Sequence, residues 1–509
     1  MVLDIGTTGG RALIFDSSGK MLSSAYCEYK STITSKGFIE HDPMTWLEAI
    51  REGIHELKEK NKVLLSKVSA LSVTSQRATL LPVDRDGKPL LPAILWQDKR
   101  SMAECAEIEK AVGSDEVYQR TGLKIDPYFS LPKLLWIRNH QPDIYQRAFC
   151  FLTTQDYIIH SLTGEFKTDW TQASRTMLFN VNDLRWDHKI AEIARVELDK
   201  LPEFYPPGTI AGKVTKACSE QIGLLEGLPV IMAGGDQQCA ALGLGVIHPG
   251  ITKVTTGTGS FVIAPVDFPE KDTAKKILCS PSAIPGSWVV EAGIFTTGAT
   301  YRWLRDEFFE GEEGGSFEVM NKEAQISPTG ANGVLHIPHY AGSAAPYWDA
   351  EATGCLFNLN LGTKKSDIVR AYLEGIAFEV KKNVEIIHFL IQNSGKQGLS
   401  EVRVSGGLAR SDLFNQIQAD IYELKVIPGR TEQATALGAA ISGFTAMKTF
   451  NSFEEAVEKM VTLDQLKVKH PNQVVRKVYR QMGKLHDKVY SVLSKENIYS
   501  MAKQIQDSR

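Results

Sequence analysis

Cysteine is scarce and scattered in this chain, and no pair of cysteines has the spacing of a metal or redox motif. The seven cysteines among 509 residues never occur as CxxC, and their number is odd. This distribution argues against a disulfide framework and against a zinc site. The eleven histidines likewise show no HExxH spacing, so no structural metal is implied.

A strong net charge and a long apolar run are missing as well. The formal net charge is −3, the pI is about 6.4, and no stretch approaches the roughly 20 apolar residues that cross a membrane. These features argue against nucleic acid and membrane as partners. Met1 stands almost at the first strand, without a charged and then apolar leader, so we expect no secretory signal and a cytoplasmic protein.

Two widespread ATP-binding patterns are also absent. The chain has no GxxxxGK[ST] loop, and it lacks the HRD and DFG elements of protein kinases. If ATP binds, it must bind at another kind of phosphate site.

The first eleven residues have the character of such a site. An apolar strand runs into Asp4, then into a glycine-threonine turn and Arg11. Glycines let backbone N–H groups approach an anion, threonine hydroxyls add donors, and a carboxylate at the end of a strand can hold a divalent metal. Asp4 is the candidate metal ligand. Gly-Thr turns also end ordinary strands, so this hairpin alone leaves both interpretations open.

A second copy of the pattern lies half a chain away. Residues 251–264 again read as strand, Gly-Thr turn and strand. Two such hairpins indicate duplicated halves, each with one phosphate turn, and a glycine-proline cluster just before the second copy marks the boundary. We therefore predict two domains, residues 1–247 and 248–509.

The pattern along the chain predicts an α/β architecture, because strand-like runs alternate with helical periodicity in the first half. Helices are expected over 44–60, 365–392, 411–421 and 434–444, and strands over 12–15, 70–74, 93–96, 229–233 and 402–405.

Asp236 is the candidate catalytic acid-base group. It follows an apolar strand and two glycines, just before the predicted boundary. Phosphorylation of an alcohol needs a carboxylate for the hydroxyl proton, a cation for the polyphosphate, and donors for the transferring oxygens. An aspartate is also a preferred helix N-cap, so Asp236 has a purely structural interpretation as well.

Several motifs in order resemble the FGGY carbohydrate kinases, and the resemblance covers nearly the whole chain. Within that family the residues resemble glycerol kinases most. The motifs are Leu-Trp-Gln-Asp-Lys-Arg at 95–100, the serine, lysine and tryptophan spacing of 128–140, Asp-Trp-Thr-Gln-Ala-Ser-Arg at 169–175, Gly-Asp-Gln-Gln at 235–238, Thr-Gly-Thr-Gly-Ser-Phe at 256–261 and Ala-Pro-Tyr-Trp-Asp at 345–349.

The resemblance implies a two-domain actin-like ATPase fold, with ribonuclease H-like duplicated halves and an active-site cleft between them. It implies ATP and Mg²⁺ as cofactors, Asp4 as metal ligand and Asp236 as general base. By position it implies an acceptor pocket of Arg77, Trp96, Tyr128, Asp236, Gln237 and Phe261. It implies ATP contacts at Thr7, Thr8, Arg11, Thr258, Gly298, Arg302, Gly407 and Ser411. Dimers or tetramers are common in the family.

One departure affects the acceptor. Glycerol kinases carry Gln-Arg-Glu in the acceptor pocket, whereas this chain has Gln76-Arg77-Ala78. Alanine removes a hydrogen-bond acceptor and is expected to open space, and a buried hydroxyl without its partner costs about 1 to 3 kcal/mol. Glycerol is the expected acceptor, and a pentulose such as D-xylulose or a longer alditol is the alternative. A non-catalytic sugar- or nucleotide-binding regulator is the alternative of another class.

Overall fold

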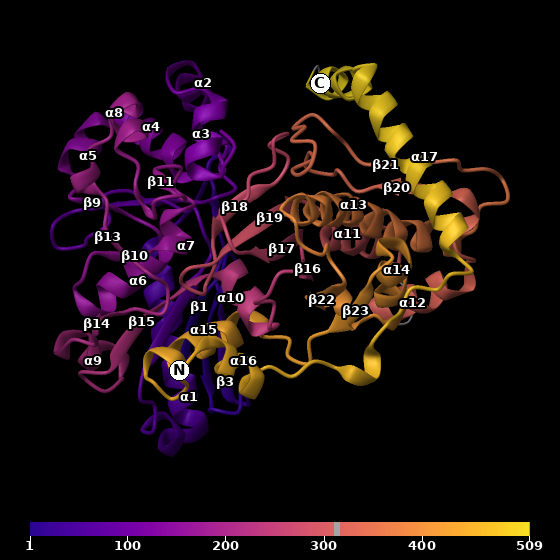
Figure 1. The fold of residues 1–509 in the computed structure, drawn as a ribbon. Helices are drawn as coiled ribbons and strands as arrows, with labels where there is room; N and C mark the ends of the chain where they lie inside the picture. Colours follow the sequence, from indigo (N-terminus) through magenta and orange to yellow (C-terminus); the bar gives the residue numbers. More distant parts are fainter. Residues whose placement is uncertain (310–315, 508–509) are drawn as a thin grey trace.

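Two six-stranded sheets form the framework of the molecule (Figure 1). The computed structural model describes residues 1–309 and 316–507. In spatial order, the first sheet contains β14 (Ile210–Lys213), β15 (Pro229–Gly235), β6 (Leu71–Ser75), β1 (Val2–Ile5), β2 (Gly9–Phe15) and β3 (Met21–Glu28). The second contains β18 (Leu278–Pro281), β19 (Trp288–Ile294), β17 (Ser260–Val266), β16 (Ile251–Thr256), β22 (Glu401–Ser405) and β23 (Lys425–Pro428).

The two sheets repeat one pairing scheme. In the first, β1 pairs antiparallel with β2 and parallel with β6, while β2 continues antiparallel to β3 and β6 parallel to β15. In the second, β16 pairs antiparallel with β17 and parallel with β22, while β17 continues antiparallel to β19 and β22 parallel to β23. The predicted duplication is therefore confirmed. Each predicted phosphate turn joins the two strands of its sheet that come first in the sequence, β1 to β2 and β16 to β17.

Amphipathic helices cover these sheets because their apolar residues recur every three or four positions. In α1 (Pro43–Leu65), Trp46, Ile50, Ile54 and Leu57 are buried, and the helix packs on β2 and β3. Its start is set by Asp42, whose side chain accepts from the Met44 N–H, and by a proline in the first turn. The predicted core helix of the second half is α13 (Lys365–Asn393), whose inner side is buried along most of its length.

Smaller elements surround each sheet. In the first half they are α2 (Met102–Ala111), α3 (Ser114–Thr121), α4 (Ser130–His140), α5 (Pro142–Arg147), α6 (Thr154–Thr163), α7 (Trp170–Ala173), α8 (His188–Ala194), α9 (Lys216–Ile222) and α10 (Asp236–Gly243), with the short strands β4 (Thr32–Ile33), β5 (Ile39–His41), β7 (Leu81–Val83), β8 (Ala93–Ile94), β9 (Cys150–Leu152), β10 (Lys167–Asp169), β11 (Phe179–Asn180), β12 (Arg185–Trp186) and β13 (Glu203–Tyr205). In the second half they are α11 (Gly298–Phe308), α12 (Phe317–Ile326), α14 (Asp412–Tyr422), α15 (Ala434–Ala446), α16 (Phe453–Met460), α17 (Arg476–Lys495) and α18 (Ile498–Asp507), with β20 (Leu335–Ile337) and β21 (Cys355–Phe357). Among the described residues, no helix has the length and apolarity needed to span a bilayer.

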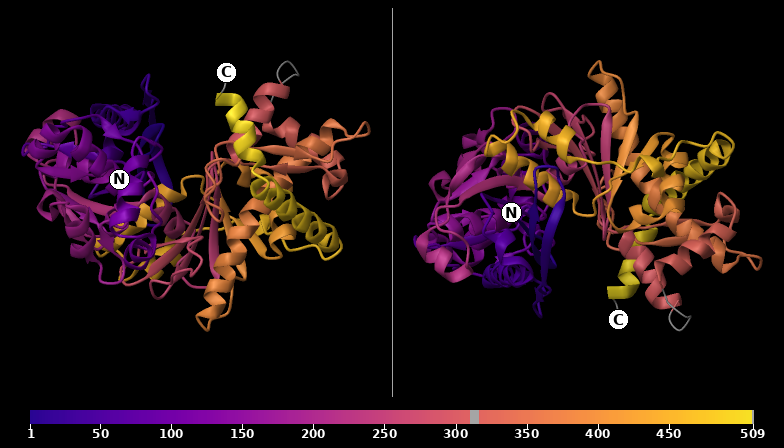
Figure 2. Two further views of the ribbon diagram at one scale, coloured as in Figure 1. Left: turned by 90° about the horizontal axis from the view of Figure 1, so that it is seen from above. Right: turned by 90° about the horizontal axis from the view of Figure 1, so that it is seen from below.

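Late in the sequence the chain returns to the first half. Helix α15 packs against β1, β2, β6 and β15 and lies along α10, and Figure 2 shows this orange segment against the indigo and magenta lobe. Glycines allow the contact: a Cβ on Gly438 would meet the Cys239 carbonyl oxygen at 1.8 Å, and one on Gly243 would meet the Ala434 carbonyl oxygen at 1.9 Å. Because α10 begins with Asp236, this packing fixes the helix that carries the candidate base.

Gly438→Ala is therefore expected to lower the free energy of unfolding by about 2 kcal/mol or more, because backbone must move to admit the methyl group. Urea or thermal unfolding measures the change. Gly483→Ala in α17 is the matched control: its Cβ would meet Phe378 at an ordinary 3.5 Å, so a gain of up to about 1 kcal/mol is expected from helix propensity. Equal effects of the two substitutions would contradict the tight α10–α15 contact.

Candidate active site

Each of the two predicted phosphate turns is closed by a backbone hydrogen bond between glycines, and this bond spans one residue more in the first turn. The Gly6 N–H donates to the Gly9 carbonyl at 3.0 Å in the first, and the Gly257 N–H donates to the Gly259 carbonyl at 2.9 Å in the second. Thr8 and Thr258 are exposed at these turns. Both turns can therefore offer donors to an anion.

Helix α11 begins directly against the second turn. The Thr297 and Ala299 N–H groups donate to the Thr258 carbonyl, and a Cβ on Gly298 would lie 2.2 Å from the Gly257 carbonyl oxygen. Only glycine fits at this junction. Gly298 is thus next to a phosphate turn, which is compatible with its predicted ATP contact, while Arg302 is exposed one turn further along the helix.

Thr7 has a hydrogen-bonding role that the sequence did not indicate. Its hydroxyl donates to the Gln76 side-chain oxygen at 2.9 Å and accepts from the Trp96 indole N–H at 3.0 Å. The predicted strand over 93–96 ends early, at Ile94, because the chain turns there, with the Asp98 N–H bonded to the Leu95 carbonyl. Trp96 is thereby placed beside the first phosphate turn.

Asp4 is an under-compensated carboxylate. Its side chain is 8% exposed and, among the described residues, it forms an ion pair with Arg11 at 3.8 Å and no hydrogen bond. Burial raises the pKa of Asp4 to about 6, with Arg11 opposing and the charge of Asp236 adding to the rise. A cation placed here would relieve this cost.

The residues around Asp4 fit a magnesium ion that also binds phosphate and water better than they fit a metal ion held only by protein side chains. Within residues 1–309 and 316–507 no group of three or more His, Cys, Asp or Glu side chains is arranged to hold a metal. Mg²⁺ is commonly bound by one or two carboxylates together with phosphate oxygens and water. Asp4 therefore fits as a ligand that acts with a bound polyphosphate.

Asp236 is the first residue of α10, at the end of β15. Its carboxylate accepts from the Gln237 backbone N–H at 2.7 Å and lies 3.3 Å from Nε of Arg77. Its side chain is still 28% exposed, whereas that of Arg77 is 1% exposed. The N-cap of α10 is Gly235, and among the described residues no side chain caps the helix, so the interpretation of Asp236 as an N-cap is wrong. Its carboxylate remains reachable, as a catalytic group must be.

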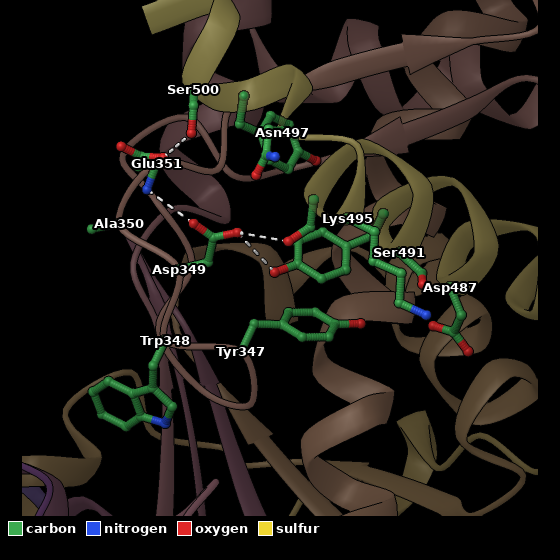
Figure 3. Close-up of a pocket in the computed structure, with 13 residues that line it drawn as sticks. Tyr347, Trp348, Asp349, Ala350, Glu351, Asp487, Ser491, Lys495, Asn497 and Ser500 are labelled. Carbon is green, nitrogen blue, oxygen red and sulfur yellow. Dashed lines mark hydrogen bonds between the residues drawn. The ribbon is translucent and has the colours of Figure 1, made fainter.

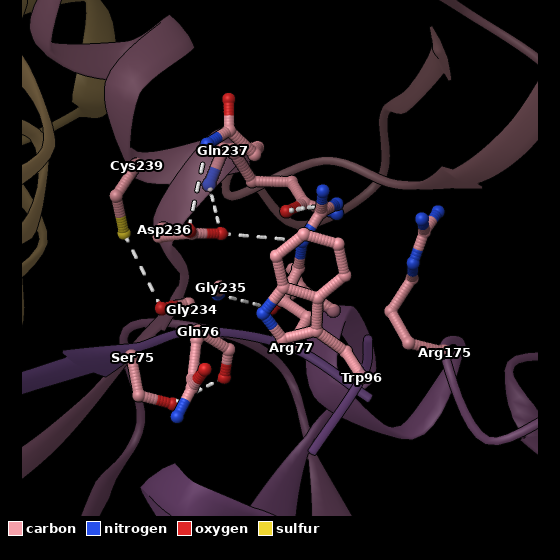
Figure 4. A network of polar contacts seen from close by, with 12 residues as sticks. Ser75, Gln76, Arg77, Trp96, Arg175, Gly234, Gly235, Asp236, Gln237 and Cys239 are labelled. Atoms are coloured by element: carbon pink, nitrogen blue, oxygen red, sulfur yellow. Dashed lines mark hydrogen bonds and ion pairs between the residues drawn. The ribbon is translucent and has the colours of Figure 1, made fainter. Parts of the chain in front are cut away.

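Arg77 is held from the other half of the molecule. Its Nη1 and Nη2 each donate to one carboxylate oxygen of Glu291 on β19, at 2.7 Å in both cases. Arg175 approaches the same carboxylate at 3.4 Å. Burial alone would raise the pKa of Glu291, but the two guanidinium groups outweigh it and lower that pKa to about 2. Figure 4 shows Arg77 beside Asp236, with Trp96 and Arg175 nearby.

A second contact between the halves fixes Gln237. The buried Lys253 ammonium on β16 donates to the Gln237 side-chain oxygen at 2.7 Å and to its backbone carbonyl at 3.2 Å. Burial lowers the pKa of Lys253 to about 7, against the opposing charges of Glu291 and Asp236. Because the oxygen of the Gln237 amide is occupied, its NH₂ group is the part left to face a ligand, and it lies 3.4 Å from Asp236.

Aromatic rings lie beside these polar groups. The Trp96 and Tyr128 ring centroids are 5.3 Å apart, and the Arg175 guanidinium lies 5.6 Å from the Tyr128 ring. Phe261, on β17, is half-buried. The structure thus brings Arg77, Trp96, Tyr128, Asp236 and Gln237 together; we call these five residues the acceptor cluster. Their binding roles and that of Phe261 stay predictions.

Ala78 does not open accessible space. It is fully buried, its φ is 65°, and its carbonyl accepts from the Ser130 hydroxyl. The expected room beside Arg77 is therefore closed by the surrounding protein. Asn358 also has a left-handed φ, 67°, a conformation that asparagine adopts more readily than most residues.

The predicted nucleoside residues of the second half differ in access. Gly407 begins the short η3 helix (Gly407–Arg410), is exposed, and has open space where a Cβ would stand. Ser411 is 8% exposed, and its hydroxyl caps α14 by accepting from the Phe414 N–H. Gly407 can admit a close ligand, whereas Ser411 already has a structural role.

The Ala-Pro-Tyr-Trp-Asp motif lines a separate cavity of about 570 Å³ against α17 and α18 (Figure 3). The Asp349 carboxylate accepts from the Tyr490 and Ser494 hydroxyls, at 3.1 and 3.4 Å. Tyr347 stacks on Tyr490 with centroids 3.8 Å apart. This motif therefore anchors the C-terminal helices.

Two family models match the chain in consecutive order. Residues 1–243 match the N-terminal domain of the FGGY family of carbohydrate kinases, and residues 252–447 match its C-terminal domain. The chain belongs to the FGGY family of carbohydrate kinases. It is accordingly a phosphotransferase with an alcohol group as acceptor, built on the predicted actin-like fold.

Individual relatives of this FGGY kinase agree over most of their length. A glycerol kinase from Thermococcus gammatolerans is 34% identical over 459 residues, 89% of this chain and 90% of that protein. The Plasmodium falciparum glycerol kinase with ADP has a TM-score of 0.85 at 25% identity, covering 97% of this chain and 98% of that one. A ligand-bound xylulose kinase from Lactobacillus acidophilus has a TM-score of 0.89 at 24% identity, with 97% and 98% covered, and shows a shared fold.

Three charged residues of this FGGY kinase were missed by sequence reasoning: Arg175, Lys253 and Glu291. Arg175 and Lys253 stand inside or beside quoted motifs, so their position was a signal. Glu291 lies in an ordinary strand pattern, and nothing local distinguishes it from a surface glutamate.

Asp4→Asn is expected to stabilise the ligand-free kinase at pH 7.5. A pKa raised from 3.8 to about 6 means that the folded state loses stability as pH rises between these values, and the full cost, about 3 kcal/mol at most, is present above pH 6. Asparagine carries no such cost, so unfolding at pH 7.5 should require about 1 to 3 kcal/mol more.

The same variant should gain less stability from Mg·ATP than the wild type, because binding to the folded state is what stabilises it. Thermal unfolding with and without Mg·ATP measures both effects. Asp16→Asn, which keeps an oxygen for the turn hydrogen bonds from Ser18 but removes the negative charge that strengthens them, is a control expected to lower the melting temperature. A destabilised Asp4→Asn with an undiminished Mg·ATP shift would contradict the role of Asp4.

Proposed function

We propose that this kinase transfers the γ-phosphoryl group of ATP to a terminal hydroxyl of a small polyol, with glycerol as the acceptor and glycerol 3-phosphate as the product. The observation that carries the proposal is the reachable Asp236 carboxylate next to the buried Arg77 guanidinium. Glycerol kinases at 34% identity over 89% of the chain support the choice of acceptor.

The acceptor cluster has the groups that a small polyol needs. Arg77 and the Gln237 NH₂ group donate hydrogen bonds, and Asp236 accepts them. Trp96 and Tyr128 offer aromatic surfaces to the C–H faces. Held in this way, one hydroxyl lies against Asp236, which takes its proton as the oxygen attacks the γ-phosphorus and the bond to the ADP oxygen breaks.

The two turns act on the other substrate. Thr7, Thr8, Arg11 and Thr258 are proposed to bind ATP phosphates, and Gly298, Arg302, Gly407 and Ser411 to contact the nucleoside. Asp4 would hold Mg²⁺, which when bound neutralises charge on the transferring phosphates. The Thr7 hydroxyl, bonded to Gln76 and Trp96, links the first turn to the acceptor cluster. We propose residues 1–247 and 248–509 as the two domains. The whole chain is proposed to form a dimer or tetramer with copies of itself.

A longer acceptor such as D-xylulose or a four- or five-carbon alditol is the second candidate, because Ala78 removes the carboxylate of the glycerol kinase motif, although its burial leaves no extra room for a larger molecule. Coupled ADP release with Mg·ATP across glycerol, erythritol, ribitol, xylitol, D-xylulose, L-xylulose, D-ribulose and gluconate decides between them by kcat/KM. We expect glycerol to be preferred. Preference for a longer compound would overturn the glycerol assignment, and silence on every acceptor with ATP still bound would favour a regulator.

Asp236→Asn tests the mechanism. The substitution is nearly isosteric, so folding and ATP binding should persist while kcat falls about a thousandfold through loss of the proton acceptor. Asp183→Asn, at an exposed aspartate paired with Arg185, is the matched control and should leave kcat unchanged. An Asp236→Asn enzyme with near wild-type turnover would dismiss Asp236 as the base.

A further inference from the structure

Glu291 is a buried charged residue to which the proposed reaction assigns no role. It is 1% exposed, on a strand of the second sheet, and its two oxygens are occupied by the two terminal nitrogens of Arg77. Arg77 follows β6 of the first sheet, 214 positions earlier in the chain. The pair therefore connects the two halves of the molecule.

Arg77 divides its N–H groups between Glu291 and the candidate catalytic helix. Its Nε lies 3.3 Å from Asp236, and its Nη1 also donates to the Gln238 side-chain oxygen at 3.1 Å. A guanidinium group is planar, so fixing its two terminal nitrogens also fixes the direction of Nε. The orientation of Arg77 toward Asp236 is thus set by Glu291.

Charge balance leads to the same role. Arg175 lies 3.4 Å from the Glu291 carboxylate, and its side chain is 2% exposed, so this carboxylate lies between two buried guanidinium groups. Without it, two buried positive charges would face one another beside the base, and removing one partner of a buried pair leaves a charge uncompensated. Arg77 would then turn toward Asp236 or toward solvent.

We propose that Glu291 is a positioning residue for the acceptor: it holds Arg77 from the second half, so the acceptor cluster is complete only when the two halves are in contact. Lys253 acts in the same sense on Gln237. Two of the five members of the acceptor cluster are therefore oriented by residues of the opposite half. Acceptor affinity, unlike ATP affinity, should depend on this pair of contacts.

Glu291→Gln keeps the shape of the side chain and removes its charge. Because the inference rests on the proposed function, the assay uses the acceptor with the highest wild-type kcat/KM. We expect the acceptor KM to rise about tenfold or more, since hydrogen bonds to charged groups are worth about 1.5 to 3 kcal/mol, while the KM for ATP stays within about threefold. Glu291→Asp keeps the charge and should raise the acceptor KM less.

Glu374→Gln is the matched control. Glu374 is also a buried carboxylate, paired with Arg370 at 2.7 Å on α13 and with the Tyr479 hydroxyl, and it contacts no member of the acceptor cluster. The Glu374→Gln variant should lower the melting temperature, because it breaks a buried ion pair. Its acceptor KM should stay within about twofold of the wild type, because the lost charge lies outside the acceptor cluster.

The outcomes separate the two proposals. A wild type that phosphorylates no acceptor overturns the proposed function and this inference with it. If the wild type is active and Glu291→Gln keeps the wild-type acceptor KM, the inference alone is overturned. The inference is also overturned if the KM for the acceptor and the KM for ATP rise in parallel in both Glu291→Gln and Glu374→Gln. If Glu291→Gln does not fold, Glu291→Asp decides: an unchanged acceptor KM contradicts the inference and a raised one supports it.

Discussion

A buried ion pair between the two halves, Arg77 with Glu291, is the interaction on which the arrangement of the site depends. Glu291 lies on β19 of the second sheet and Arg77 follows β6 of the first, and each would be costly to bury alone. The bidentate geometry resolves this cost and fixes an orientation at the same time. Asp236, Gln237 and the aromatic rings then lie around a guanidinium group whose direction is already set.

The duplicated sheets explain how such a site arises. Each half presents a hairpin turn with exposed threonine. Within the described residues no strand pairing joins the two six-stranded sheets, and the halves meet through side chains and close backbone contacts. Helix α15 packs with its backbone close to α10 at Gly438, and this contact fixes the helix that begins with Asp236. Asp4 is kept buried and under-compensated at the first turn, a local cost that is typical of functional sites rather than of stable cores.

Features with a local pattern were predictable from the sequence. Both hairpins, the long helix α13 and Asp236 at the end of a strand follow from short-range signals of turn chemistry and periodicity. Glu291 was not, because its function depends on a partner 214 positions away and its own strand looks ordinary. The expectation that Ala78 opens space was wrong for a similar reason. The identity of one residue does not reveal how neighbouring side chains pack against it, and Ala78 is fully buried.

We expect this chain to move a phosphoryl group onto an alcohol and not onto water. Phosphorus-31 NMR of a reaction containing the protein, Mg·ATP and glycerol distinguishes the two products, because a phosphate monoester and inorganic phosphate give separate resonances. We expect one monoester to form for each ADP released, and no inorganic phosphate beyond the background of a reaction without protein. Inorganic phosphate as the main product, at the same rate with and without glycerol, would contradict the claim.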